Sequence, residues 1–228
     1  MLLSARQPLP TDVLVHDYLT IEGRKISKSS GVTIDPAQLA TTYGTDAVRW
    51  WLLREVPRVG DADFTIARLI ARANDELANG LGNLVNRVIS MIHRYRAGHP
   101  PRTSDSPPGS ETLRKASQRA PELIETALAN FDFRAGTAAV WAIADAANRY
   151  ISQTQPWLLA RADRDGDTGA AHQLDTVLAT LIQAIRTLGD TLTPFLPETA
   201  TRITRQCTTN TTGRLPDPKP VFGRIAAP

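Results

Sequence analysis

The sequence has very little cysteine and no long apolar run. Cys207 is the only cysteine among 228 residues, which excludes an internal disulfide and a zinc site built on several thiolates. No run of about 18 uncharged apolar residues occurs, so no membrane-spanning helix is expected. The first residues lack a basic segment followed by an apolar one, which argues against a secretory signal. These absences predict a protein of the reducing cytoplasm.

Acidic residues are missing from one long stretch. No Asp or Glu lies between Leu77 and Ser104, whereas four arginines do: Arg87, Arg94, Arg96 and Arg102. The net charge of the whole chain is only +3, so this local excess is the stronger signal of an anionic partner. A basic strip of this kind favours contact with a nucleic-acid backbone, although the same arginines would also suit a solvated helix end and loop.

Helical periodicity covers most of the chain after residue 35. Asp35-Pro36 and Thr45-Asp46 have the composition of helix starts, and Trp50, Trp51 and Trp141 lie in apolar helical stretches typical of a core. Further helices are predicted at about 65–97, 111–130, 133–153, 170–193 and up to 206. The segment 98–110 is rich in proline, glycine and serine and predicts a loop. Residues 207–220 predict a second loop, and 221–225 a short extended end.

The first 30 residues have a different character. Val13-Leu14-Val15 has the composition of a strand buried in a parallel sheet, yet the rest of the chain offers no obvious sheet for it to join. Downstream, "GRKISKSSG" at residues 23–31 places two lysines among three serines between glycines. By itself this segment is equally consistent with a solvated lysine-rich turn.

Six blocks in order resemble methionyl-tRNA synthetase, a class I aminoacyl-tRNA synthetase. They are "VLVHDYLTIEGRKISKSSGVTIDP", "YGTDAVRWWLLREVP", "GDADFT", "ANGLGNLVNRV", "ANRYISQTQPW" and "LTPFLPETA". The resemblance runs over nearly the whole chain and is to the C-terminal part of that family. It implies that "KISKS" is the lysine-serine signature loop known as KMSKS, with Ile26 in the methionine position.

In this family the signature loop closes over ATP, and its lysines offset charge on the pyrophosphate while methionyl-adenylate forms. The resemblance therefore implies ATP contacts for Lys25, Ser27, Lys28 and Ser29, with Lys28 and Lys25 as the catalytic cations. The H-x-G-H signature of the nucleotide-binding half is absent from this sequence, and so are ligands for the family's zinc. We expect no metal and no methionine activation by this chain alone, with ATP bound only alongside a catalytic partner.

The family reads the methionine anticodon, CAU, through an asparagine and an arginine one helical turn apart and a tryptophan after proline. By resemblance these are Asn83, Arg87 and Trp157. The i, i+4 spacing puts Asn83 and Arg87 on one helix face, where an amide and a guanidinium suit the edges of splayed bases and an indole suits stacking. Taken singly, Asn83 and Arg87 would equally suit packing and surface roles, and Trp157 a buried cap. Arg94 and Arg96 are expected to contact the tRNA backbone.

The expected fold is mainly α: a helix-bundle anticodon-binding domain with a short β-containing N-terminal remnant of a class I synthetase catalytic domain. The expected parts are 1–34 for the remnant, 35–64 for a linking helical region and 65–228 for the bundle and tail. The function expected is binding of methionine tRNA. One alternative is the C-terminal half of a split or truncated ligase that works with a separate nucleotide-binding half. A second is a helical interaction protein without tRNA affinity.

Overall fold

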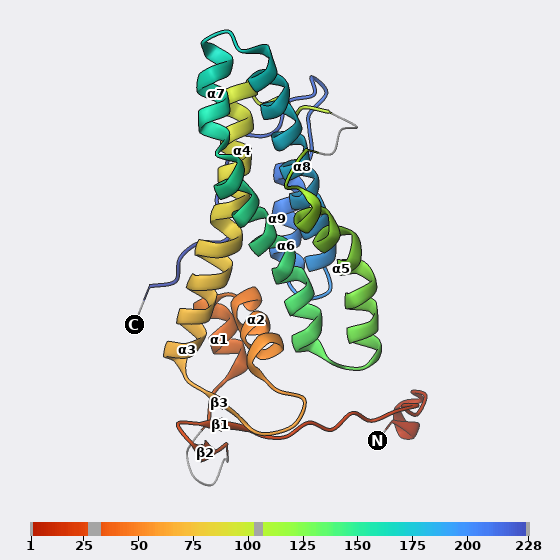
Figure 1. The fold of residues 1–228 in the computed structure, drawn as a ribbon. Helices are drawn as coiled ribbons and strands as arrows, with labels where there is room; N and C mark the ends of the chain where they lie inside the picture. Colours follow the sequence, from red (N-terminus) through yellow and green to blue (C-terminus); the bar gives the residue numbers. More distant parts are fainter. Residues whose placement is uncertain (1, 27–32, 103–106, 227–228) are drawn as a thin grey trace.

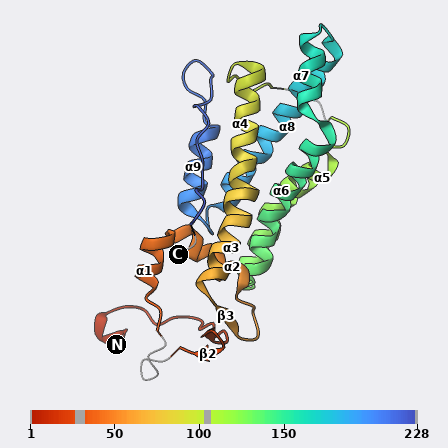
Figure 2. The same cartoon turned by 90° about the vertical axis from the view of Figure 1, so that its left-hand side faces the viewer.

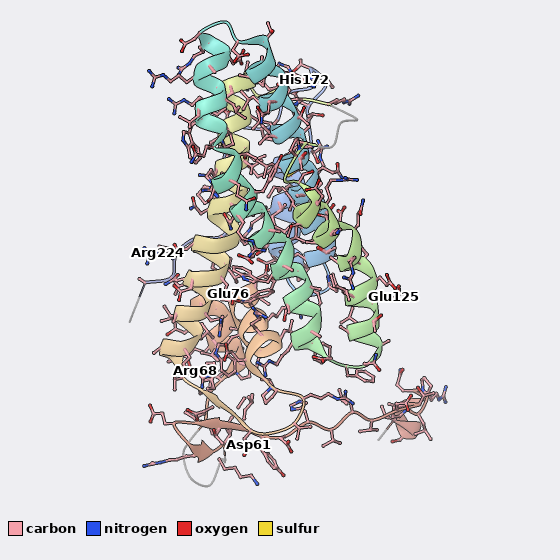
Figure 3. The ribbon with its side chains drawn as sticks, in the orientation of Figure 1. Asp61, Arg68, Glu76, Glu125, His172 and Arg224 are labelled. Carbon is pink, nitrogen blue, oxygen red and sulfur yellow. The ribbon has the colours of Figure 1, made fainter. Side chains whose placement is uncertain are left out.

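The computed structural model describes residues 2–26, 33–102 and 107–226. In these residues the protein is mainly α-helical, with a small sheet at one end of a tall bundle of helices (Figure 1). The mainly α fold class predicted from the sequence is confirmed. Asp61 beside the sheet and His172 near the far end of the bundle mark the two ends of the molecule (Figure 3).

The sheet has three short strands in the order β2-β1-β3. Strand β1 (Leu19–Ile21) pairs antiparallel with β2 (Arg24–Lys25) and parallel with β3 (Ala62–Phe64), with Ile21 opposite Phe64. The predicted strand at residues 13–15 is wrong, because those residues form no strand and are exposed. The parallel partner that the sequence did not reveal is β3, whose three residues are too few to show a periodic pattern.

Two predicted helix starts are confirmed. Helix α1 (Pro36–Tyr43) begins where the Asp35 carboxylate accepts a hydrogen bond from the Ala37 backbone N–H at 2.8 Å, and α2 (Thr45–Glu55) follows at once. The two tryptophans of α2 face different cores. Trp50 belongs to the main bundle core, whereas Trp51 meets Phe64 of β3 edge-on, with the ring centroids 4.8 Å apart. Helix α2 therefore joins the sheet to the bundle.

The long helix predicted at 65–97 is present but carries a π-helical segment. It consists of α3 (Ile66–Arg72), the π-helix η3 (Ala73–Gly82) and α4 (Asn83–Arg96). Its predicted apolar stripe, from Leu77 to Ile92, is buried. Periodicity did not reveal the π-helix, because Leu77 and Leu81 are buried four residues apart, as they would be on one face of an α-helix. Trp141 packs against this segment at Gly80, where an added Cβ would lie 2.3 Å from the indole ring.

The remaining helices complete the bundle around one main core. They are α5 (Glu111–Ala129), α6 (Phe133–Thr154), α7 (Pro156–Arg164), α8 (Thr168–Leu192) and α9 (Pro197–Cys207). Four of the five agree with the predicted ranges, and α7 was missed. Figure 2 shows α4 running the height of the bundle with α9 on one side and α6 on the other. Asp132 and Asp167 cap α6 and α8 through their carboxylates.

The C-terminal tail is irregular and lies along the long helix. The expected extended end at 221–225 forms no strand; instead, Asn74 in the π-helical segment holds Ile225 by two backbone contacts of 2.8 Å. Val221 is buried in the main core, and Phe222 packs beside Gly82. The tail therefore covers the side of the long helix near α1 and α2.

Candidate nucleic-acid interface

The hairpin that leads into the "KISKS" segment is fixed by one carboxylate. Glu22 and Gly23 form a two-residue turn in which both have positive φ, at 51° and 73°, the conformation that matches the twist of a tight hairpin. Asp63 of β3 accepts hydrogen bonds from the Gly23 backbone N–H and the Thr20 hydroxyl, both at 2.7 Å. These two bonds, with Arg68 nearby, hold the pKa of Asp63 below its ordinary value.

Of the four residues expected to contact ATP, the structure describes only Lys25. Its ammonium lies 4.4 Å from the centre of the exposed Tyr18 ring, a cation–π contact. Ser27, Lys28 and Ser29 lie outside the described residues. Asp17 bonds the backbone N–H of Gly60, so its carboxylate has a structural contact at the loop before β3.

Asn83 and Arg87 lie on α4 in different environments. Asn83 is exposed at the first turn of the helix, and Arg87 is half-buried. The Nη2 of Arg87 donates to the Oδ1 of Asn148 on α6 at 2.7 Å, while its Nε is buried with no hydrogen-bond partner in the described part of the chain. Burial lowers the pKa of Arg87, because removing a cation from water disfavours its charged form.

Trp157 lies on the first turn of α7 and is 45% exposed. Gln155 ends α6 in the left-handed conformation at φ 44°, and Pro156 then begins the new helix, so the chain bends sharply just before the indole. Trp50 and Trp51 are buried and Trp141 is half-buried, as the sequence predicted. Trp157 is thus the one tryptophan of the four that presents a large part of its ring to solvent.

Two contacts of α4 place Trp157 relative to the other site residues. Arg87 bonds Asn148 on α6, and Arg96 bonds Asp163 on α7 at 2.9 Å, so Trp157 lies on the chain between two points that are tied to α4. From Asn148 to the end of α6 is about 9 Å at the rise of an α-helix. Figure 1 shows α7 at the same end of the bundle as the C-terminal end of α4.

Of the basic residues at the C-terminal end of α4 and just after it, Arg96 has partners within the protein, whereas Arg94 and Arg102 are exposed. Arg96 forms ion pairs with Asp163 and Asp175 and donates to two backbone carbonyls. Its guanidinium therefore holds α4, α7 and α8 together. Arg94 and Arg102 are exposed, and the Arg94 guanidinium lies 5.9 Å from the centre of the Tyr95 ring. The sequence stretch lacks acids, but the fold brings Asp163 and Asp175 to it.

The described residues form neither a metal-binding cluster nor a membrane-spanning helix. No cluster of three or more His, Cys, Asp or Glu side chains there is arranged to hold a metal ion. None of the helices in the described ranges has the length and apolar content needed to span a membrane.

Sequence comparison with protein families gives two adjacent matches. The family described as tRNA synthetases class I (M) matches residues 1–89. The anticodon binding domain of methionyl tRNA ligase matches residues 101–222, more than half of the chain. The chain belongs to the methionyl-tRNA ligase family. The resemblance drawn from the six sequence blocks is thereby confirmed.

Individual methionyl-tRNA ligases agree with this assignment. The chain is 38% identical over 206 residues to the methionine–tRNA ligase of Caldanaerobacter subterraneus subsp. tengcongensis. The aligned residues make up 90% of this chain and 32% of that ligase. It is 34% identical over 207 residues to the Bacillus subtilis ligase, over 90% of this chain and 30% of that protein. The chain thus spans about a third of the length of these curated relatives and corresponds to their C-terminal portion.

Solved structures of the family have the same fold. Mycobacterium tuberculosis methionyl-tRNA synthetase in complex with methionyl-adenylate matches with a TM-score of 0.86 and 28% identity, over 98% of this chain and 46% of that one. The apo form of the same synthetase matches with a TM-score of 0.84 and 26% identity. That match covers 100% of this chain and 46% of the synthetase chain.

Two residues of this ligase-family chain were not found from the sequence. Asn148 lies in a matched block, "ANRYISQTQPW", but it is 61 residues from Arg87, and no local pattern joins the two. Asp63 lies in the matched block "GDADFT", and its partners Thr20 and Gly23 are 43 and 40 residues away. Both residues act through contacts that exist only after folding.

Proposed function

We propose that this chain binds methionine tRNA through the α4, α6 and α7 side of the bundle and recognises the CAU anticodon with Asn83, Arg87 and Trp157. The observation that carries the proposal is the exposure of Trp157, 45% at the start of α7. A Pro-Trp pair used only as a helix cap would bury the ring. An exposed indole instead offers a flat apolar face on which a splayed base stacks.

The three side chains supply different contacts. Asn83 offers a donor and an acceptor to a base edge. Arg87 contributes a charged planar group that can bind a base edge or a phosphate. Arg94 and Arg102, which are exposed, add charge for the sugar-phosphate backbone. Arg96 has internal partners and is assigned a structural role.

We further propose that the chain needs a nucleotide-binding half in order to activate methionine. The sequence contains no H-x-G-H motif, and Lys25 lies on a short exposed hairpin. Lys25 and Lys28, with Ser27 and Ser29, would then meet the phosphates of ATP only after that half is in place. The site of action proposed is the cytoplasm.

Binding measurements test the first proposal directly. The affinity of the purified chain for a methionine tRNA is compared, at several salt concentrations, with its affinity for a tRNA that differs only in the anticodon. We expect a preference for CAU and its loss in Trp157→Ala, at about 1 to 3 kcal/mol for one stacked base. The matched control is Trp51→Phe, which alters a buried tryptophan of α2 that packs against Phe64 of β3. Weak binding that depends neither on the anticodon sequence nor on Trp157 would contradict the proposal. It would favour the alternative of a helical interaction protein without tRNA affinity.

A specific observation favours the split-ligase alternative as a second candidate. Val13 and Val15 are 76% and 82% exposed, and Tyr18 is exposed nearby. Leu14 and Val15 also line a cavity of about 580 Å³ together with Leu52, Phe131 and Phe133. Apolar groups in such a cluster are typical of a docking surface.

Pyrophosphate exchange into ATP with methionine tests this second candidate. The chain alone is expected to be inactive, and adding a separately produced nucleotide-binding half of a related ligase is expected to restore exchange. Activity of the chain by itself would contradict the proposed need for a partner.

A further inference from the structure

Arg87 differs from the other half-buried arginines of the long helix in the chemistry of its partner. Arg72 bonds Glu55 and Glu76, and Arg96 bonds Asp163 and Asp175. Arg87 bonds a neutral amide, Asn148.

The direction in which the pKa of each arginine is shifted depends on whether its partner is a carboxylate or an amide. Burial acts to lower the pKa of Arg72 and of Arg96, but their carboxylate partners more than reverse it, and both are raised. The pKa of Arg87 is lowered by burial, with no carboxylate to oppose it. Its positive charge is therefore held in a partly desolvated place where the described residues supply no counter-charge, an arrangement unfavourable for folding.

The contact with Asn148 fixes where this charge lies. A guanidinium only donates, so the Asn148 amide must turn its oxygen to Arg87. Nη2 is then anchored, and Nε is buried without a partner. Within the described residues no hydrogen bond engages Nη1, and it is not among the buried unpaired atoms. The free edge of the guanidinium is thus the one that an incoming acceptor can reach.

We infer that Asn148 is a positioning residue for RNA recognition, which orients the Arg87 guanidinium by a neutral hydrogen bond and so leaves its charge available to the anticodon. The inference rests on the proposed function. A carboxylate at the same place would hold Arg87 more strongly, but it would also cancel the charge that an RNA acceptor needs. An amide gives orientation without neutralisation.

The deciding variant is Asn148→Asp, which keeps the shape of the side chain and adds one negative charge beside Arg87. We expect the affinity for methionine tRNA to fall about ten-fold at moderate salt, and the slope of log affinity against log salt to become shallower by about one. At the same time the melting temperature is expected to rise, because Arg87 gains an ion pair. A residue with only a structural role would move stability and affinity in the same direction.

A double-mutant cycle separates this effect from general repulsion of RNA. In the Arg87→Ala background, Asn148→Asp is expected to change affinity by less than about three-fold and to give no rise in melting temperature. Asn148→Ala is expected to retain the fold and lose most of the preference for CAU. Asn86→Ala serves as the matched control, since Asn86 is a half-buried asparagine of α4 that is not hydrogen-bonded to Arg87.

The outcomes distinguish the two proposals. If wild type prefers CAU, Trp157→Ala loses that preference and Asn148→Asp binds like wild type, the role of Asn148 is overturned and the proposed function stands. An equal loss in the Arg87→Ala background would also overturn it, because the aspartate would then act without Arg87. If wild type shows no preference for CAU, the proposed function fails and the role of Asn148 falls with it.

Discussion

Valines of the N-terminal segment and of the helix bundle have opposite environments. Val13 and Val15 in the N-terminal segment are 76% and 82% exposed, whereas Val85 and Val88 of α4 are fully buried. The bundle gains its folding free energy from its own apolar contacts, as a domain core does. The N-terminal segment is attached through the pairing of β1 with β3, through the packing of Leu19 and through polar contacts of Asp17, Asp61 and Asp63. The bundle is thus built to be stable by itself, while the N-terminal segment leaves Val13 and Val15 uncovered.

A leucine truncation in each region gives the largest expected contrast. Leu181 is fully buried in α8 and Leu9 is 62% exposed. Leu181→Ala is expected to lower the free energy of unfolding by about 2 to 5 kcal/mol, because it leaves a cavity in the core. Leu9→Ala is expected to change it by less than about 0.5 kcal/mol. Urea unfolding followed by circular dichroism measures both, and a comparable loss for Leu9 would show that the N-terminal segment contributes to the bundle's stability.

The π-helical segment is a second place to test the tight packing of the bundle. Gly80→Ala would place a Cβ 2.3 Å from the Trp141 ring, and a rigid indole cannot move aside cheaply. We expect a loss of about 1 to 3 kcal/mol in the free energy of unfolding from overpacking. The matched control is Gly223→Ala, where nothing lies within 4 Å and φ is not positive. Equal stability of the two variants in thermal unfolding would contradict the close contact.

Arg87→Met tests whether the half-buried arginine of α4 contributes to recognition and not to the stability of the fold. The substitution removes a desolvated cation and its unpartnered Nε, but also loses the bond to Asn148. These effects oppose each other, so the free energy of unfolding is expected to stay within about 1 kcal/mol of wild type. Affinity for methionine tRNA is expected to fall. A large loss of stability with unchanged binding would reverse the assignment of Arg87 from recognition to packing.

The smallest effect is expected at the hairpin. Since the folded-state pKa of Asp63 lies below its ordinary value, its ionised form stabilises the hairpin fully above about pH 4. That contribution is lost as the pH falls through the lowered pKa. Hydrogen exchange at the Gly23 amide, followed by NMR, should therefore accelerate in acid. Asp63→Asn is expected to abolish the pH dependence and to leave the unfolding of the bundle unchanged.

The differences between expectation and structure have identifiable causes. The strand expected at 13–15 rested on composition, and β-propensity describes how well a residue fits a half-buried sheet face rather than a preference of the backbone alone. Helix α7 was missed because it is short and begins directly after a helix end, with Gln155 in the left-handed conformation.

The sequence by itself determined the long helices and their buried stripe, the starts of α1 and α2, and membership of the methionyl-tRNA ligase family. The helices and their starts depend on periodicity and on neighbours within a few residues, and the family is shown by ordered blocks of residues, all of which a sequence displays directly. Only the tertiary structure decided that Trp157 is exposed, that Arg96 is ion-paired and that Arg87 rests on a neutral amide. The partners Asp163, Asp175 and Asn148 lie 67, 79 and 61 residues away. Helix packing brings them together, and the charge state of each arginine's surroundings follows from that packing.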